Sequence, residues 1–215
     1  MKSILSFVLF FIMLLCNGQK LKFDIKVTYL VKNDTLLSKS SSYGSSVNEN
    51  YVMSIRFRTK DTIAEVFNIV AKQKHTYQVI EHKNEIDSLS IEFKYLETKS
   101  FTLSKKFNIN EFAFKHIKIV DTVETFQLVH SKRNKVKYEF KAITSPINLF
   151  YLFRFGCLHG IEFETNLNYS KPVVITHCIT PNKKTEFTLI EFNEVDLKLE
   201  LPEKIIRNNF FLNQK

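Results

Sequence analysis

Apolar and polar residues alternate along most of this chain with a period of two. In residues 21–32 polar side chains hold most of the positions between the members of one apolar set, which comprises Phe23, Ile25, Val27, Tyr29 and Val31. Such alternation places one set of side chains on each face of a β-strand and is typical of a strand with one buried face. The same pattern predicts further strands over 51–57, 76–82, 86–97, 114–120, 123–130, 136–143, 161–167, 173–179 and 187–201.

Three other segments connect these strands. Residues 38–50 are rich in Ser, Gly and Asn and poor in apolar residues, which predicts a loop. Residues 83–85 separate two predicted strands and indicate a hairpin. Residues 62–74 fit either a helix that begins with a Thr62–Glu65 capping box or a strand, and their β-branched content favours the strand.

The fold class follows from about ten predicted strands with no internal repeat and no linker. We expect a single, mainly β domain over residues 19–215: an antiparallel curled sheet, half-barrel or sandwich, with one short apolar helix at 145–156. The chain has four glycines, of which Gly18 precedes this domain. Tight hairpin turns usually need glycine, so we expect longer loops or asparagine-based turns.

The stretch from Ser145 to Gly156 differs from the alternating strands because it is apolar on nearly every side. Ser145 suits the N-cap of a helix, Pro146 suits its first position, and Gly156 suits its C-terminal end. Inside the stretch, Asn148 and Arg154 are the strongly polar residues. A helix that is apolar all round must be buried or must cover something apolar. This one is far shorter than the ~20 residues that cross a bilayer.

Four interpretations of this stretch stay open from the sequence. It is a core helix on the concave face of the sheet, a lid over a cavity for an apolar ligand, a segment that touches a membrane surface, or a buried strand. The Ser-Pro start argues against the strand. Under the lid interpretation the ligand lies beneath residues 147–155, and the expected ligand-binding residues are the aromatic ones: Phe150, Tyr151, Phe153 and Phe155.

The N-terminal segment, residues 1–18, has the pattern of a secretory signal peptide. Lys2 precedes an apolar run over 4–15, and small or polar residues follow up to Gly18. We expect cleavage after Gly18 and export to the periplasm or the extracellular space. The alternative is lipid anchoring at Cys16, but a lipobox needs a small residue before the cysteine and this chain has Leu15. No later apolar run is long enough to predict a transmembrane segment in the mature chain.

The chain is basic, with a formal net charge of +9 from 31 Lys and Arg against 22 Asp and Glu. Such a balance attracts anionic lipids, polysaccharides or nucleic acids. The basic residues are scattered over strand faces and match no nucleic-acid motif, so we expect a solvated surface and no nucleic-acid partner. The few glycines exclude a glycine-rich phosphate loop, and we expect no cofactor.

Two cysteines follow the predicted cleavage site, Cys157 and Cys178. In an oxidising compartment they are a candidate disulfide, which would close a loop of about 20 residues and stabilise the fold by ~3 kcal/mol. Together with His159 and His177 they have the ligand types of a zinc site. Neighbours on a strand point to opposite faces, however, so we expect no metal site. A cysteine nucleophile would lack an identifiable orienting group and oxyanion hole.

The functional prediction is an exported, non-enzymatic binding protein of the cell envelope that holds an apolar or amphiphilic ligand under residues 147–155. Aromatic and aliphatic residues share strand faces, and a curled sheet lined in this way can hold such a ligand. The alternative is a protein-interaction or assembly module that uses a sheet edge or the basic surface. A hydrolase is the third alternative. Glu162 and Glu164 resemble paired glycosidase carboxylates, but alternating charge on a solvated strand explains them better.

Overall fold

The computed structural model describes residues 20–57, 61–83, 89–101, 108–159, 161–164 and 166–201. Within these residues the chain forms one antiparallel sheet of 11 strands, one short α-helix and one 3-10 turn. The strands are β1 (Lys20–Asn33), β2 (Leu36–Gly44), β3 (Tyr51–Phe57), β4 (Thr62–Asn68), β5 (Gln73–Lys83), β6 (Leu89–Ser100), β7 (Phe112–Val120), β8 (Val123–His130), β9 (Lys135–Thr144), β10 (Val173–Ile179) and β11 (Thr185–Glu200). The 3-10 turn is η1 (Ile109–Glu111) and the helix is α2 (Phe150–Cys157). Across these described ranges, no helix is long and apolar enough to cross a membrane.

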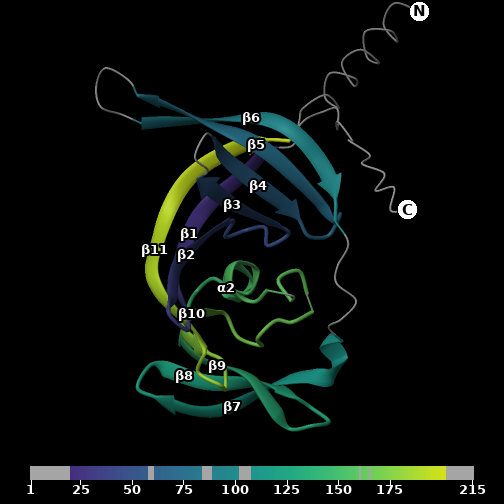
Figure 1. Cartoon of the computed structure of the whole chain (residues 1–215), viewed down its shortest axis with the longest axis vertical. Helices are drawn as coiled ribbons and strands as arrows, with labels where there is room; N and C mark the ends of the chain where they lie inside the picture. Colours follow the sequence, from purple (N-terminus) through teal and green to yellow (C-terminus); the bar gives the residue numbers. More distant parts are fainter. Residues whose placement is uncertain are drawn as a thin grey trace, which may run out of the picture.

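The sheet has its first and last strands at its centre. The strand order is β6-β5-β4-β3-β2-β1-β11-β10-β9-β8-β7, so one meander runs outward from β1 to β6 and a second runs back from β7 to β11. In Figure 1 the sheet curls into a C whose back is formed by β1 and β11, and α2 lies on its concave side. The predicted fold class is therefore confirmed as a curled sheet, or half-barrel, with one short helix.

The long central strands bend because their pairing is interrupted. The register between β1 and β11 shifts between Phe23 and Ile25 and again between Thr28 and Tyr29. An extra residue on one strand of a pair increases the local twist and bends the strand. These two irregularities lie in the strand pair that forms the back of the C, where the sheet has to curve around α2.

Alternation predicted most of the strands. β10 has its predicted bounds, and β4 shows that the strand interpretation of 62–74 is right. Tight turns are made largely without glycine, since positive φ angles occur at Asp34, Asn134 and Lys183 among other non-glycine residues. Most of the hairpin predicted at 83–85 and the whole of the predicted signal peptide lie outside the described residues.

The prediction of a loop over 38–50 is wrong, because residues 38–44 belong to β2. A strand over this region was missed because its residues facing α2 are serines, which give no apolar alternation. These positions hold serines for a steric reason. A Cβ placed on Gly156 of α2 would lie 2.6 Å from Ser42 Oγ and 3.2 Å from Ser40 Oγ, so the helix leaves room only for small side chains.

The strand predicted at 161–167 is also wrong. In the described part of this segment the chain makes successive turns, in which the N–H groups of Ile161, Glu164 and Leu167 donate to carbonyls three residues earlier at 2.9–3.1 Å. The Arg154 side chain is 2 % exposed, and its Nη1 donates to the Leu167 carbonyl at 2.7 Å. A buried guanidinium needs such acceptors, so Arg154 favours turns that present carbonyls to it over an extended strand.

The helix begins at Phe150 and not at Pro146, so its predicted start is wrong. The Leu149 N–H donates to the Val173 carbonyl of β10 at 3.1 Å, which holds the chain before the helix against the sheet. Asn148 Oδ1 then accepts from the Phe150 N–H at 3.2 Å. The sequence predicted Ser145 as the N-cap, but Asn148 accepts a hydrogen bond from the first residue of the observed helix instead. The hydrogen bond from Leu149 to β10 favours this later start.

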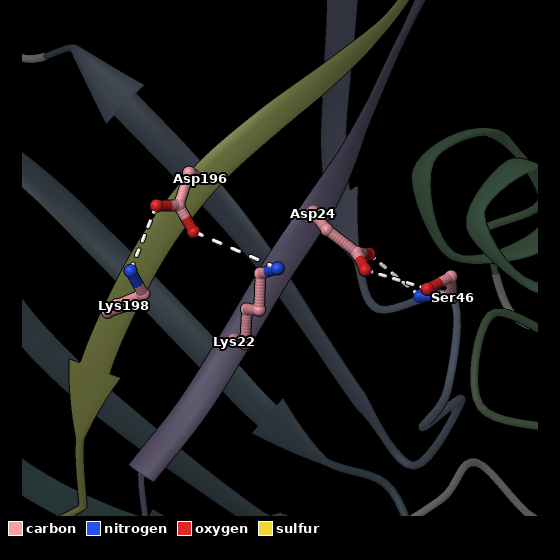
Figure 2. Close-up of polar contacts among 5 residues, drawn as sticks. All are labelled: Lys22, Asp24, Ser46, Asp196 and Lys198. Carbon is pink, nitrogen blue, oxygen red and sulfur yellow. Dashed lines mark hydrogen bonds and ion pairs between the residues drawn. The ribbon is translucent and has the colours of Figure 1, made fainter.

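A surface contact fixes the connection between β2 and β3, as Figure 2 shows. Asp24 of β1 accepts from the backbone N–H of Ser46 at 2.8 Å and from its hydroxyl at 2.7 Å. Nearby, Asp196 of β11 lies 2.9 Å from the Lys198 ammonium and 3.9 Å from that of Lys22. These exposed ion pairs contribute little to stability, whereas the Asp24 bonds define the path of the loop.

The concave face of the sheet is filled by α2. Phe150, Leu152 and Phe153 are 0 % exposed. The Phe153 ring meets Tyr29 of β1 edge to face at a centroid distance of 5.0 Å and Phe187 of β11 at 5.8 Å. Each buried aromatic side chain of this kind stabilises the fold by several kcal/mol. The core-helix interpretation of this stretch is therefore confirmed.

Two glycines allow α2 to lie this close to the sheet. A Cβ on Gly44 of β2 would overlap the Tyr151 hydroxyl and would lie 2.7 Å from a Leu152 methyl carbon. A Cβ on Gly156 would collide with Ser42, as described above. One glycine therefore lies on each side of the contact, and a larger residue at either position would push the helix away from β2.

We expect Gly156→Ala to lower the free energy of unfolding by about 1–3 kcal/mol, because the added methyl group overpacks the contact with Ser42. Urea unfolding followed by circular dichroism measures this change. Ser42→Ala removes the oxygen that the methyl group meets, so the double variant should recover part of the loss. Equal losses in the single and double variants would contradict the steric explanation.

A second anchor holds the chain that follows α2. The Tyr169 hydroxyl donates to Glu124 Oε1 at 2.6 Å, and its ring stacks on Phe126 at 3.9 Å. His116 Nδ1 lies 2.8 Å from the same oxygen and Lys171 Nζ lies 3.3 Å from it. Burial alone would raise the pKa of Glu124, but these hydrogen bonds together hold that pKa below its usual value.

We expect Tyr169→Phe to shift acid unfolding to higher pH. Because the folded-state pKa of Glu124 lies below its unfolded value, ionised Glu124 stabilises the fold above the unfolded pKa, and this contribution is lost as the pH falls through the folded pKa. The variant keeps the ring and the burial but lacks the strongest donor, so the folded pKa rises. Melting temperatures between pH 3 and pH 7 measure the shift. A parallel loss at every pH would contradict this role of Glu124.

Candidate functional site

The four aromatic residues predicted to bind a ligand divide into two groups. Phe150, Tyr151 and Phe153 are 0–1 % exposed, and protein side chains fill the space between them and the sheet. The Tyr151 hydroxyl donates to the Ser45 carbonyl at 3.0 Å. Phe155 is only half-buried and lines a groove at the C-terminal end of α2. A ligand beneath the helix would have to displace the first three side chains, whereas Phe155 is already accessible.

The groove beside Phe155 is about 320 Å³ in volume, and we call it the serine groove. Its lining includes Ser40, Ser42, Ser54, Arg56, Phe155 and Glu162. The groove lies where two strands separate. β2 and β3 are paired at Tyr43 and Met53, whereas β3 pairs with β4 along its whole length. Polar backbone and side chains of both strands therefore face the opening.

A second groove lies on the other side of Gly156, and we call it the leucine groove. Its volume is about 680 Å³, and its lining includes Val31, Leu36, Leu37, Tyr138, Cys157 and Phe187. Leu36 and Leu37 are 73 % and 66 % exposed at the turn between β1 and β2. The two grooves share Lys39, Ser40, Gly156 and His159 in their linings, so the serine groove adjoins a groove that combines large apolar side chains with polar residues such as Asn33 and Thr185.

The contact that separates the two grooves is a hydrogen bond between α2 and β2. The Ser40 hydroxyl donates to the Gly156 carbonyl at 2.7 Å. This carbonyl lies in the last turn of the helix, where backbone oxygens lack partners within the helix. The bond therefore satisfies the helix end and joins α2 to β2 where the linings of the two grooves meet.

Two buried polar atoms of the serine groove have no hydrogen-bond partner among the described residues: Ser54 Oγ and Glu162 Oε2. Nearby, Arg56 Nη2 lies 3.0 Å from Glu65 Oε2, and Lys74 Nζ lies 2.6 Å from Glu65 Oε1. The Arg56 side chain remains 59 % exposed. The groove thus holds a carboxylate, a guanidinium and a hydroxyl beside aromatic rings.

A third groove lies at the far end of the sheet, between β6 and the paired ends of β1 and β11. Its volume is about 620 Å³, and Tyr77, Phe93 and Tyr95 are among its lining residues. The Tyr77 hydroxyl donates to the Glu200 carbonyl at 3.2 Å and so links β5 to β11. None of the unpartnered buried polar atoms of the described residues lines this groove, which makes it a weaker candidate for a specific site.

The cysteine and histidine residues singled out in the sequence do not form one cluster. Cys157 and Cys178 are buried and free, His159 is exposed, and His177 Nε2 lies 2.8 Å from Glu186 Oε1. Within the described ranges, no three residues of metal-ligating type come together. Burial raises the pKa of both thiols, so neither is activated as a thiolate.

Glu162 and Glu164 lie in the turns after α2 and not on a strand, so they do not share a strand face. Glu162 faces the serine groove, and its charge, after burial and the effect of Cys178, contributes to raising the pKa of Tyr138 to about 12. Sequence reasoning missed the remaining groove residues Ser54, Arg56 and Leu37. Ser54 and Arg56 come from β3 and Leu37 comes from β2, and no local pattern connects the two strands.

Comparison with known proteins adds little. No protein-family model and no curated protein matches the chain. Among solved structures, it is similar to a DUF1329 family protein from Desulfovibrio piger, with 7 % identity over 85 % of this chain and 88 % of that chain. The TM-score is 0.23, and a similarity of this size carries no conclusion about fold or function.

We expect neither Cys157 nor Cys178 to react with a thiol reagent in the native state, because both are buried and both have a raised pKa. After denaturation without reductant both should react. Counting thiols with and without guanidinium measures this. Rapid native reaction would contradict the burial, and a denatured chain with no reactive thiol would establish the disulfide that the sequence suggested.

Proposed function

We propose that this chain is an exported protein of the cell envelope that binds an amphiphilic ligand, without catalysis, in the serine and leucine grooves. The observation that carries the proposal is that a polar groove adjoins, at Gly156, a larger groove with several large apolar side chains in its lining. An apolar pocket with a few polar groups at one end is the usual design of a site for such a ligand. Export rests on the pattern of the first 18 residues.

The apolar part of the ligand fits the leucine groove. Its volume of about 680 Å³ lies within the range of small-molecule sites. Leu36 is exposed at its mouth and would be covered by an alkyl chain, which is favourable in proportion to the apolar area removed from water. We therefore place the ligand at the C-terminal end of α2 and not beneath residues 147–155. Of the four residues predicted to bind it, Phe155 remains in the proposed site.

A second candidate function is supported by the same exposed leucines. Two neighbouring leucines that are 73 % and 66 % exposed are also suited to contact an envelope protein. The two functions differ in what the purified chain binds. A ligand site takes up small amphiphiles in the absence of any partner, whereas a docking surface does not.

We expect 11-(dansylamino)undecanoic acid to bind the mature chain with a rise in dansyl fluorescence. Leu36→Asp should weaken binding about tenfold, because Leu36 shares the strand face of Ser38 and Ser40 and the variant places a charge beside the alkyl chain. Leu96→Asp is the matched control, since Leu96 is 41 % exposed on β6 outside both grooves.

Two results would contradict the proposal. One is the absence of any fluorescence change in the wild-type chain, which would favour the protein-docking function. The other is an equal loss of binding in both variants, which would show that the probe does not occupy the leucine groove.

A further inference from the structure

Two side-chain oxygens of residues that line the serine groove have no hydrogen-bond partner among the described residues. Ser54 Oγ comes from β3 and Glu162 Oε2 comes from the turns after α2, and both residues line the same groove although the two oxygens themselves are buried. A buried polar atom without a partner costs about 1–3 kcal/mol, and more when it belongs to a charged group. An ionised carboxylate can only accept hydrogen bonds. The missing partner of Glu162 is therefore a donor.

The groove also carries the opposite charge, at Arg56. Glu65 is already shared by two cations, because Lys74 binds its Oε1 and Arg56 binds its Oε2. A guanidinium has five N–H donors, and the Arg56 side chain is 59 % exposed, so donors remain for a ligand. A carboxylate and a guanidinium in one groove are complementary to a molecule that itself carries both charges.

The wall of the groove is aromatic. The Phe155 ring lies 5.0 Å from that of Phe67 and 5.9 Å from that of Phe163, measured between centroids, and all three residues line the groove. Aromatic faces attract alkylammonium groups and pack against their methylene carbons. This wall therefore favours an ammonium on a short alkyl arm over a compact inorganic cation.

We propose that the serine groove binds a zwitterionic headgroup with a primary ammonium on Glu162 and Ser54 and an anionic phosphate or carboxylate on Arg56. This inference rests on the proposed function, since the alkyl chain of the same molecule extends past Gly156 into the leucine groove. The ligand class is an amine-bearing zwitterionic amphiphile. An ammonium supplies three donors, enough for both unpartnered oxygens.

The test compares two lipids that share the lauroyl chain and the phosphate. Lauroyl-lysophosphatidylethanolamine carries the ammonium, and lauroyl-lysophosphatidylglycerol does not. Isothermal titration calorimetry below the micelle concentration, at physiological salt, measures both affinities. We expect the ethanolamine lipid to bind about tenfold more tightly, as one charge-assisted hydrogen bond predicts. The net charge of +9 acts in the opposite direction, because it favours the more anionic glycerol lipid.

Glu162→Gln should remove this preference, because it keeps the size of the side chain and removes the charge that pairs with the ammonium. Glu164→Gln is the matched control, since Glu164 lies in the same turns and outside the groove lining. Melting temperatures of both variants confirm that they fold. Arg56→Gln should weaken both lipids, because both carry the phosphate.

The outcomes separate this inference from the proposed function. Equal binding of both lipids by the wild-type chain, or a preference that survives Glu162→Gln, overturns the ammonium assignment and leaves the amphiphile site standing. Binding of dodecyl maltoside as tight as that of the ethanolamine lipid also overturns it, because hydroxyl groups would then satisfy the two oxygens. If none of these amphiphiles binds, the proposed function itself fails.

Discussion

The close approach of α2 to β2 is the contact on which the rest of this structure depends. Gly44 and Gly156 provide the space for it, because a side chain at either position would overlap atoms of the opposite element. With the helix held there, Phe150 and Phe153 reach across to the rings of Tyr29, Phe140 and other core residues. The curled sheet is closed on its concave side by its own chain, so its interior is a packed core.

That packing also determines where a ligand can bind. Because the space beneath α2 is filled, the accessible surfaces lie where the helix ends and where β2 and β3 separate. The bond from Ser40 to the Gly156 carbonyl divides these surfaces into the serine groove and the leucine groove. Two of the buried polar atoms that lack a hydrogen-bond partner among the described residues, Ser54 Oγ and Glu162 Oε2, belong to residues on the polar side.

The turns after α2 link this surface to the core. Arg154 is buried and bonds the Leu167 carbonyl and Asn168 Oδ1, and burial lowers its pKa to about 10. Tyr169 and Glu124 hold the next residues to β8. Two polar anchors therefore fix the path of a segment that has no regular secondary structure, and they bring Glu162 into the groove.

The sequence by itself determined the strands, because the alternation that defines β1 or β10 is a local property of a pleated backbone with one buried face. It also placed an apolar helix near 150–157, although not its first residue, which a backbone bond to Val173 decided. Only the tertiary structure made 38–44 a strand and 161–167 a set of turns, through the contact of Ser42 with α2 and the burial of Arg154. The two grooves were likewise decided only by the tertiary structure. Their residues come from β1, β2, β3, β4, β9, β11, α2 and the neighbouring turns, and periodicity within one element carries no information on which elements meet.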